Sequence, residues 1–175
     1  MKITFKNDLQ DLIAFNKYAV NTLPLFKKKK RFFVFIFPIL LLVAVGFFSV
    51  RDRDINQLFI GLLIIVIYEI CYFIIHKRGI PRMITKLSKD QSFKTMLGEH
   101  TMEITEEGII EKTEFNERTD YWKSITGIKT DNDRTYIFIG PINAHVINRN
   151  EILSGDLNAF VEEINNKLKQ TSRSN

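Results

Sequence analysis

Two long apolar runs, separated by a short charged link, constrain the fold more than any other feature of this 175-residue chain. Residues 32–50 carry no charged side chain, and residues 58–75 carry a single carboxylate, Glu69. An α-helix of about 20 residues crosses the roughly 30 Å hydrocarbon core of a bilayer. A buried helix of a soluble protein is rarely apolar on every side over such a length. We therefore predict a two-helix transmembrane hairpin over residues 32–78.

The charges around the two runs predict the orientation of the hairpin. The link, residues 51–57, is short, so the two helices must run antiparallel as neighbours. Basic residues gather on the outer flanks, at Lys27, Lys28, Lys29, Lys30, Arg31, Lys77 and Arg78. Because cytoplasmic flanks carry the excess of lysine and arginine, we predict a multi-pass protein of the cell membrane with both termini in the cytoplasm. A lipid-specific or nucleic-acid patch is the alternative for the lysine run, although topology alone accounts for it.

The interior of the hairpin contains a carboxylate and a proline. Glu69 is ionisable within an apolar run, and Pro38 frees the carbonyl of Val34 from its helical hydrogen bond. Our hypothesis is that Glu69 is protonated and donates to this carbonyl, or that it reaches a basic residue such as Arg31. The alternative is a functional carboxylate, for example in a proton relay.

The remaining residues of interest in the apolar runs are small. Gly46 and Gly61 are expected at similar depth, where small residues let two helix backbones approach. Cys71 is the single cysteine, so no disulfide can form within the chain, and a reducing compartment fits this composition.

Charge is unevenly distributed along the chain, whose formal net charge is +5. Basic residues are in excess over residues 1–98, and acidic residues are in excess over residues 99–175. A basic half beside apolar runs fits an anionic membrane surface. An acidic second half argues against nucleic acid as a ligand.

Residues 1–31 are predicted to form a strand and an amphipathic helix. Residues 2–6 alternate as a strand does, Asn7 is the expected helix N-cap, and an apolar face repeats at helical spacing up to Leu23. That face could lie in the membrane interface, but its polar side is poor in lysine and arginine, which favours packing on a cytoplasmic domain. The strand needs a partner sheet, and the C-terminal half of the chain is its only source.

Residues 79–98 are predicted to form a juxtamembrane connector. Gly79-Ile80-Pro81 is expected to break the second apolar helix, and residues 82–97 again show helical spacing. Gly98 is expected to end this connector helix.

From Glu99 onward the spacing of apolar residues alternates, which predicts short antiparallel strands. These strands cover residues 100–105, 109–115, 118–122, a segment from Ile125, 135–139 and 144–147. Trp122 is expected to anchor their core. An apolar stripe over residues 157–168 predicts a final helix, capped by Ser154 or Asp156, and residues 171–175 are expected to be disordered.

The predicted fold class is therefore a membrane α-helical hairpin plus an α+β cytoplasmic domain over residues 99–170. The antiparallel sheet or barrel of this domain would be closed by the C-terminal helix, which is the layout of pleckstrin-homology-like domains.

Several loose motifs carry a resemblance to a known family. They are Gly98…Thr101…Ile104-Thr105-Glu106-Glu107-Gly108-Ile109, then Trp122-x-x-Ile125-x-x-Ile128, then Tyr136-Ile137-Phe138 and a closing helix, after a basic-flanked apolar hairpin. In this arrangement nearly the whole chain resembles the bacterial YcxB-like proteins. The resemblance implies a small bacterial membrane protein with a pleckstrin-homology-like cytoplasmic domain, and it implies no biochemical activity. The chain departs from the family pattern at Asn148-Arg149-Asn150, where a turn with proline and basic residues is common.

No pattern in the sequence predicts catalysis, a cofactor or a metal ion. His76, His100 and His145 lie in unrelated contexts, and Glu106-Glu107 lacks the partners that a metal or glycosidase site needs. The same two carboxylates occupy the hairpin turn where lipid-binding domains of this layout place basic residues. We therefore expect no specific phosphoinositide binding at that turn.

Two functions are compatible with these features. The first is a membrane-anchored interaction module without catalytic activity, whose sheet edge or acidic face binds a partner protein or another copy of the chain. The second is a subunit of a small oligomeric transport or channel assembly built on Glu69, Cys71 and Pro38.

Overall fold

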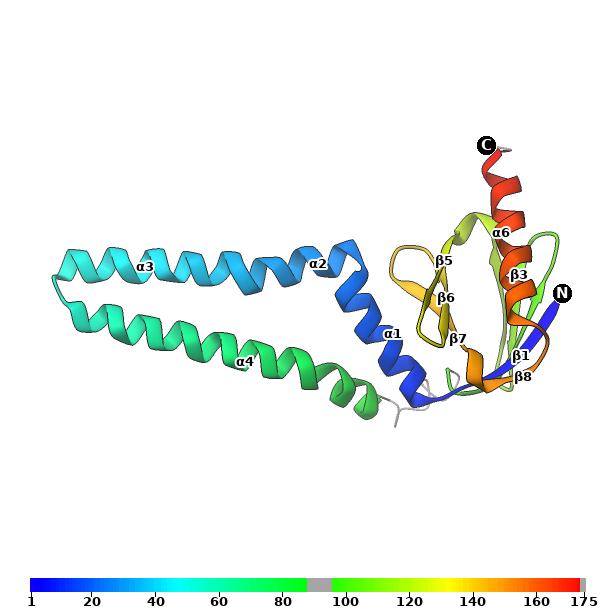
Figure 1. The fold of residues 1–175 in the computed structure, drawn as a ribbon, viewed down its shortest axis with the longest axis horizontal. Coiled ribbons are helices and arrows are strands. Elements are labelled where there is room, and N and C mark those ends of the chain that lie inside the picture. The colour runs from blue at the N-terminus through cyan, green and yellow to red at the C-terminus, as the bar shows by residue number, and fades with distance from the viewer. Residues whose placement is uncertain (88–95, 174–175) are drawn as a thin grey trace. The chain divides into compact units, whose positions relative to one another are not determined.

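The structure is a computed structural model that describes residues 1–87 and 96–173 (Figure 1). It divides into two compact units. The β unit consists of Met1–Asn16 and Ile84–Asn175, and the hairpin unit is Lys17–Met83. Residues 1–31 and residues 99–170 were expected to form separate parts, whereas in the structure the start of the chain belongs to the same unit as the C-terminal domain.

The β unit contains two antiparallel sheets with the strand orders β4-β3-β2-β1-β8 and β5-β6-β7. The strands are β1 (Lys2–Asn7), β2 (Gly98–Ile104), β3 (Gly108–Thr113), β4 (Glu117–Tyr121), β5 (Ile125–Asp131), β6 (Arg134–Ile139), β7 (Asn143–Asn148) and β8 (Ile152–Ser154). Two 3₁₀ turns, η2 (Trp122–Ser124) and η3 (Arg149–Glu151), lie between strands. The antiparallel class is as predicted. Because the described strands form two separate sheets, a closed barrel is not confirmed.

β1 lies inside the larger sheet although it is the first element of the chain. Alternation places Ile3 and Phe5 on the same face, and both are fully buried. β1 pairs with β2, where Ile3 lies opposite Met102, and with β8 on its other side. The predicted pairing of this strand with the C-terminal half is therefore confirmed. β8 is absent from the sequence prediction because a strand of 3 residues is too short to show alternation.

One core cluster in the described residues joins both sheets to the C-terminal helix α6 (Leu157–Arg173). Its buried members are Ile3, Phe5, Met102, Ile104, Ile109, Trp122, Ile125, Ile137, Ile147, Leu157, Phe160 and Ile164. The indole Nε1 of Trp122 donates to the carbonyl of Glu106 at 3.0 Å. The inward faces of the two sheets and the apolar stripe of α6 therefore share one interior.

The caps of the two helices in this unit differ in part from the prediction. For α1 (Leu9–Thr22), the N-cap is Asp8 rather than Asn7, because Asp8 and Asp11 each accept a hydrogen bond from the backbone N–H of the other. For α6, Asp156 caps the helix through the N–H groups of its first turn. α6 continues through Arg173, past the expected start of disorder at residue 171, and residues 174–175 lie outside the described residues.

The hairpin unit contains two long apolar helices that lie side by side (Figure 1). The first comprises α2 (Pro24–Arg31), the π-helical turn η1 (Phe32–Ile36) and α3 (Phe37–Asp52), and the second is α4 (Ile55–Leu87), whose residues up to Met83 belong to this unit. The segments Pro24–Asp52 and Ile55–Gly79 are long and apolar enough to cross a membrane. Only 6% of the most apolar stretch of each is buried, unlike the core helix of a soluble protein.

α4 continues through the predicted break at Gly79-Ile80-Pro81 as one helix to Leu87. That prediction is wrong, because a proline removes a single N–H donor and disturbs one turn, while the turns on either side remain helical. The predicted connector helix over residues 82–97 is thus the end of α4 as far as residue 87. Its remaining part, residues 88–95, lies outside the described residues.

Candidate functional site

A network of charged side chains lies between the two sheets of the β unit. Glu111 of β3 and Asp120 of β4 belong to the larger sheet, and His145 of β7 belongs to the smaller one. Glu111 lies opposite Met102 and His145 lies opposite Ile137, and both partners are core residues. Since opposite residues on paired strands share a face, these charged side chains point into the interior.

His145 bridges two carboxylates. Its Nδ1 lies 3.2 Å from Glu111 Oε1, and its Nε2 lies 2.8 Å from Asp120 Oδ2. An ionised carboxylate has no proton to donate, so both ring nitrogens must donate, which requires the imidazolium form. Arg118 donates to Asp120 through Nε and Nη2, with Nη2 2.8 Å from Oδ1. Two cations therefore balance two anions in this network.

The pKa values follow from these contacts. Burial alone would lower the pKa of His145, but hydrogen bonds to Asp120 and Glu111 raise it to about 9. Burial favours the neutral form of Glu111, yet hydrogen bonds from His100 and His145 hold the pKa of this carboxyl well below its usual range. The pKa of Asp120 is also lowered, since hydrogen bonds from His145 and Arg118 outweigh its burial. All three groups are therefore charged at neutral pH.

His100 of β2 extends the network towards β1. Its Nδ1 lies 3.0 Å from Glu111 Oε1, and its ring stacks on Phe5 with centroids 5.6 Å apart. Its Nε2 is buried and has no hydrogen-bond partner among the described residues. The described residues contain no group of three or more His, Cys, Asp or Glu that could hold a metal ion. The side chains of the network face one another, so its chemistry is that of an ionic clamp between two sheets.

The sequence prediction that His100 and His145 lie in unrelated contexts is wrong, because both contact Glu111. Alternation along the strands could have predicted that both histidines point inward, but not which carboxylate each one contacts. His100 is in phase with Met102, and His145 is in phase with Ile147, so each histidine was due to face the core. Which carboxylate each one meets depends on how the sheets stack, and no sequence spacing records that.

A second buried group holds the start of α1 on the other face of the smaller sheet. Asp11 is fully buried and accepts hydrogen bonds from Arg134 Nε at 2.8 Å and from Asn148 Nδ2 at 3.0 Å. One turn further on, the ring of Phe15 lies 5.5 Å from that of Tyr136. The first part of the amphipathic helix therefore packs on the β unit, which is the alternative that the sequence favoured.

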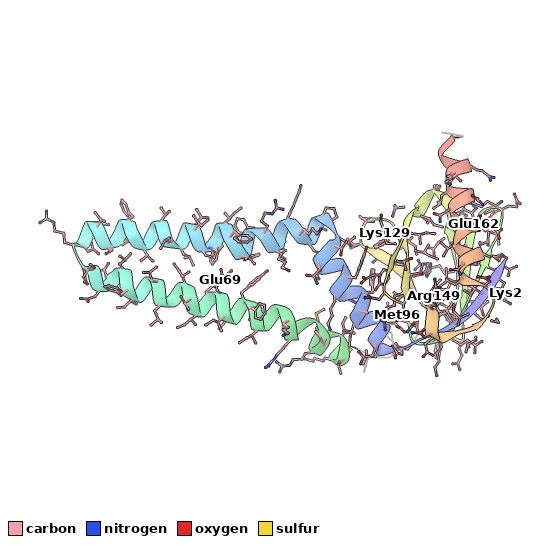
Figure 2. The ribbon with its side chains drawn as sticks, in the orientation of Figure 1. Lys2, Glu69, Met96, Lys129, Arg149 and Glu162 are labelled. Carbon is pink, nitrogen blue, oxygen red and sulfur yellow. The ribbon has the colours of Figure 1, made fainter. Side chains whose placement is uncertain are left out.

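An open groove of about 530 Å³ runs along α6. It is lined by Thr130, Thr135, Arg149, Leu157, Asn158, Val161, Glu162, Asn165, Asn166 and Lys169. Arg149 and Glu162 of this lining are labelled in Figure 2, and Arg149 Nη2 donates to Asn158 Oδ1 at 3.0 Å. β5, which contributes Thr130, is the terminal strand of its sheet, so one of its edges faces no other described strand. The groove thus combines side-chain donors and acceptors with a free sheet edge.

In the hairpin unit, a tyrosine hydroxyl donates a hydrogen bond to the carbonyl that Pro38 leaves without a backbone donor. In the π-helical turn, the N–H of Phe37 donates to the carbonyl of Phe32, five residues back. In this register residue 38 would donate to the carbonyl of Phe33, but proline has no N–H. The hydroxyl of Tyr68 donates to that carbonyl at 3.1 Å. The freed carbonyl is therefore one residue earlier than the α-helical register predicts.

Glu69 makes neither of the contacts expected from the sequence among the described residues. Its Oε1 is buried without a hydrogen-bond partner. The residue lies on α4 in the hairpin unit (Figure 2), next to Tyr68, which takes the predicted capping role. Glu69 is therefore a carboxyl group in an apolar helix, and no described residue forms a hydrogen bond with its Oε1.

Close packing of the two apolar helices involves one glycine of the predicted pair. A Cβ at Gly61 would overlap the side chain of Val45, whereas nothing lies within 4 Å of a Cβ at Gly46. Backbone approach therefore occurs at Gly61 against a valine.

The flanking basic residues lie on α2 and α4. Those that are exposed are Lys27, Lys28, Lys29, Arg31, Lys77 and Arg78. Lys30 is half-buried, and its Nζ donates to Asn21 Oδ1 at 3.1 Å.

The family comparison bears on the β unit. The family model described as YcxB-like protein matches residues 104–164, from the end of β2 into α6. This segment contains Glu111, Arg118, Asp120 and His145 and much of the groove lining. The comparisons with curated proteins and with solved structures give no match. The resemblance seen in the sequence is thereby confirmed over residues 104–164, the segment that the YcxB-like family model matches.

Proposed function

We propose that this protein is a membrane-anchored interaction module whose hairpin unit holds the β unit at the cytoplasmic surface of the cell membrane. The observation that carries the proposal is the exposure of the hairpin. Large apolar side chains cover both long helices, and Val43, Phe47 and Phe73 are each more than 60% exposed. The free-energy cost of exposing such a surface is lowest in the hydrocarbon core of a bilayer, and both helices are long enough to cross that core.

The orientation follows from the flanking charges. The outer flanks carry the lysine-rich segments on α2 and α4, while the link carries Arg51 and Arg53. Under the positive-inside rule both termini, and with them the β unit, lie in the cytoplasm. In this proposal the β unit retains the pleckstrin-homology-like layout of antiparallel sheets and a closing helix.

The groove along α6 is the site at which this module would bind its protein partner. It presents amide, hydroxyl and charged groups of both signs beside the free edge of β5, which suits an extended peptide segment. Glu106 and Glu107 lie in the turn before β3, so the proposal includes no phosphoinositide recognition there.

Carbonate extraction tests the anchor. Membranes that contain the full chain are washed at alkaline pH and sedimented. We expect the chain in the pellet, with detergent releasing it, because a spanning hairpin is held by buried apolar surface. Release by carbonate alone would contradict the anchor and the topology.

Site-specific photo-crosslinking in native membranes tests the groove. A photoreactive residue replaces Asn165, which lines the groove, or Glu103, which is exposed on β2 outside it. We expect a crosslinked species of defined mass from position 165 and none from position 103. A species of twice the chain mass would identify the partner as a second copy. Equal crosslinking from both positions, or none from position 165, would contradict the proposed site.

One observation favours the second candidate, a subunit of an oligomeric transport assembly. The buried Oε1 of Glu69 has no hydrogen-bond partner in the described part of the chain. An ionisable group inside a membrane span costs free energy, and such groups commonly serve a function such as proton transfer. Proton flux into liposomes that contain the full chain tests this candidate. Flux that disappears in Glu69→Gln would support it, and equal leakage with and without the substitution would exclude it.

A further inference from the structure

A second groove lies wholly within the hairpin unit. Its volume is about 480 Å³. It is lined by Val20, Phe26, Lys29, Lys30, Phe33, Phe37, Tyr68 and Tyr72. These residues come from the end of α1, from α2, from η1 and α3, and from α4. The groove is therefore assembled by both long helices.

The groove has a cationic part and an aromatic part. The two lysines are on α2, and none of the described lining residues carries a carboxylate. From Lys30 to Phe37 the helix rises by about 10 Å, at 1.5 Å per residue. The aromatic part is ordered by ring contacts, with Phe37 and Tyr68 centroids 5.2 Å apart and those of Phe33 and Tyr72 6.4 Å apart.

This arrangement matches an amphipathic anion in size and polarity. A phosphate group bears the charge that two lysines attract, and an acyl chain fits beside Phe33 and Phe37, which lie about one and two helical turns beyond Lys30. The hydroxyl of Tyr68 already donates to the carbonyl of Phe33, so this polar group is satisfied within the protein and the aromatic part of the groove remains largely apolar.

We propose that the groove binds one anionic glycerophospholipid, with its phosphate at Lys29 and Lys30 and an acyl chain against Phe33, Phe37 and Tyr72. This inference rests on the proposed membrane anchor and adds a specific ligand to it. It differs from general attraction of a polybasic segment to a charged surface, because two lysines of the run line the groove and two others do not.

The chain supplies a matched pair of variants for the test. In one variant Lys29→Gln and Lys30→Gln are combined, and in the other Lys27→Gln and Lys28→Gln are combined. Both lose the same charge from the same helix, but only the first pair lines the groove. Asn21→Ala, which removes the hydrogen bond to Lys30, serves as a third variant that controls for loss of that contact.

The measurement is native mass spectrometry of the full chain in neutral detergent, titrated with phosphatidylglycerol or with phosphatidylcholine of the same acyl chains. We expect the wild-type chain to bind one phosphatidylglycerol in preference to phosphatidylcholine. Because a hydrogen bond to a charged group contributes more than a neutral one, loss of Lys29 and Lys30 should weaken this binding about 10-fold or more. The Lys27 and Lys28 variant and Asn21→Ala should bind within about 2-fold of wild type.

Several outcomes would overturn the inference. Equal weakening in both lysine variants would assign the effect to general electrostatics, and equal affinity for the two lipids would remove the role of the anionic headgroup. A chain that resists carbonate extraction but shows no lipid preference would contradict lipid binding in the groove and would still support the membrane anchor. A chain that carbonate releases would overturn both.

Discussion

The β unit buries most of its large apolar side chains, whereas the hairpin unit exposes most of them. In the β unit, Asp11 is fully buried and His145 is 8% exposed, and each is surrounded by partners. In the hairpin unit, Val43 and Phe73 are each 65% exposed. A domain in water hides apolar groups and buries charges only where they are paired. The comparison indicates that one chain contains surfaces suited to two solvents, which is the basis of the anchor that we propose.

In each unit, nevertheless, a side-chain donor serves an acceptor that the fold would otherwise leave without a partner. The imidazolium of His145 donates to two carboxylates in the β unit, and the hydroxyl of Tyr68 donates to a proline-freed carbonyl in the hairpin. The charged contact should contribute more to the free energy of unfolding than the neutral one, because removal of one partner of a buried ion pair leaves an uncompensated charge in the interior.

The largest effect is expected at His145 in the β unit. His145→Ala leaves Glu111 and Asp120 with less positive charge around them, and loss of one partner of a buried ion pair costs about 3–5 kcal/mol. Urea unfolding of the full chain in detergent, followed by fluorescence, measures this cost, because Trp122 is the only tryptophan and belongs to the core of the β unit. The control Glu114→Gln is exposed and should change stability by about 0.5 kcal/mol or less. Similar effects of the two substitutions would contradict the ionic clamp.

An intermediate effect is expected from pH. His145 has a folded pKa of about 9 against 6.5 for the free group, so its contribution is complete below pH 6.5 and is lost as the pH rises through 9. That loss amounts to up to about 3 kcal/mol, at 1.4 kcal/mol per pKa unit. The lowered pKa values of Glu111 and Asp120 act in the opposite direction, because their contribution is present above 4.5 and 3.8 and is lost in acid.

Stability of the β unit should therefore be highest between about pH 4.5 and 6.5. Urea midpoints of wild type and His145→Gln across this range and up to pH 9.5 check the alkaline limb. The variant should lose the fall above pH 6.5. An unchanged alkaline slope in the variant would assign the fall to another group.

The smallest effect is expected at Tyr68 in the hairpin unit. Tyr68→Phe removes one neutral hydrogen bond to the carbonyl of Phe33, and such bonds contribute about 1 kcal/mol or less in membrane helices. Pro38→Ala restores an N–H to the helix, so Tyr68→Phe should cost less in that background. The helical circular dichroism signal during thermal unfolding in detergent measures both costs. A cost that is the same in both backgrounds would show that the hydroxyl does not compensate for the proline.

Long, regular patterns in the sequence predicted structure better than single residues did. The long apolar runs and the alternation around Met102 and Ile137 predicted the helices and most strands, because one periodicity persisted over several residues. Predictions that depended on one local residue were less reliable. Pro81 was expected to end a helix that continues through it, and Asn7 was expected to cap a helix that Asp8 caps.

The candidate sites were harder to predict than the elements. No spacing links Glu111 to His145, which lie on different sheets, or Asp11 to Arg134, which are joined across most of the chain. The groove along α6 and the groove between the long helices likewise combine residues from elements far apart in sequence. Such sites form only when helices and strands pack against one another, so the pattern within a single element cannot predict them.

The amino-acid sequence alone determined which segments form the apolar helices and where most of the strands lie, because these properties depend on periodicity within a segment. The tertiary structure decided that β1 enters the C-terminal sheet between β2 and β8, that His145 is charged between two carboxylates, and that Tyr68 rather than Glu69 serves the carbonyl near Pro38. These outcomes depend on distances of a few ångströms between segments that no local pattern specifies. Free energies of hydrogen bonding and charge pairing vary steeply over such distances, so they are set only when the elements pack.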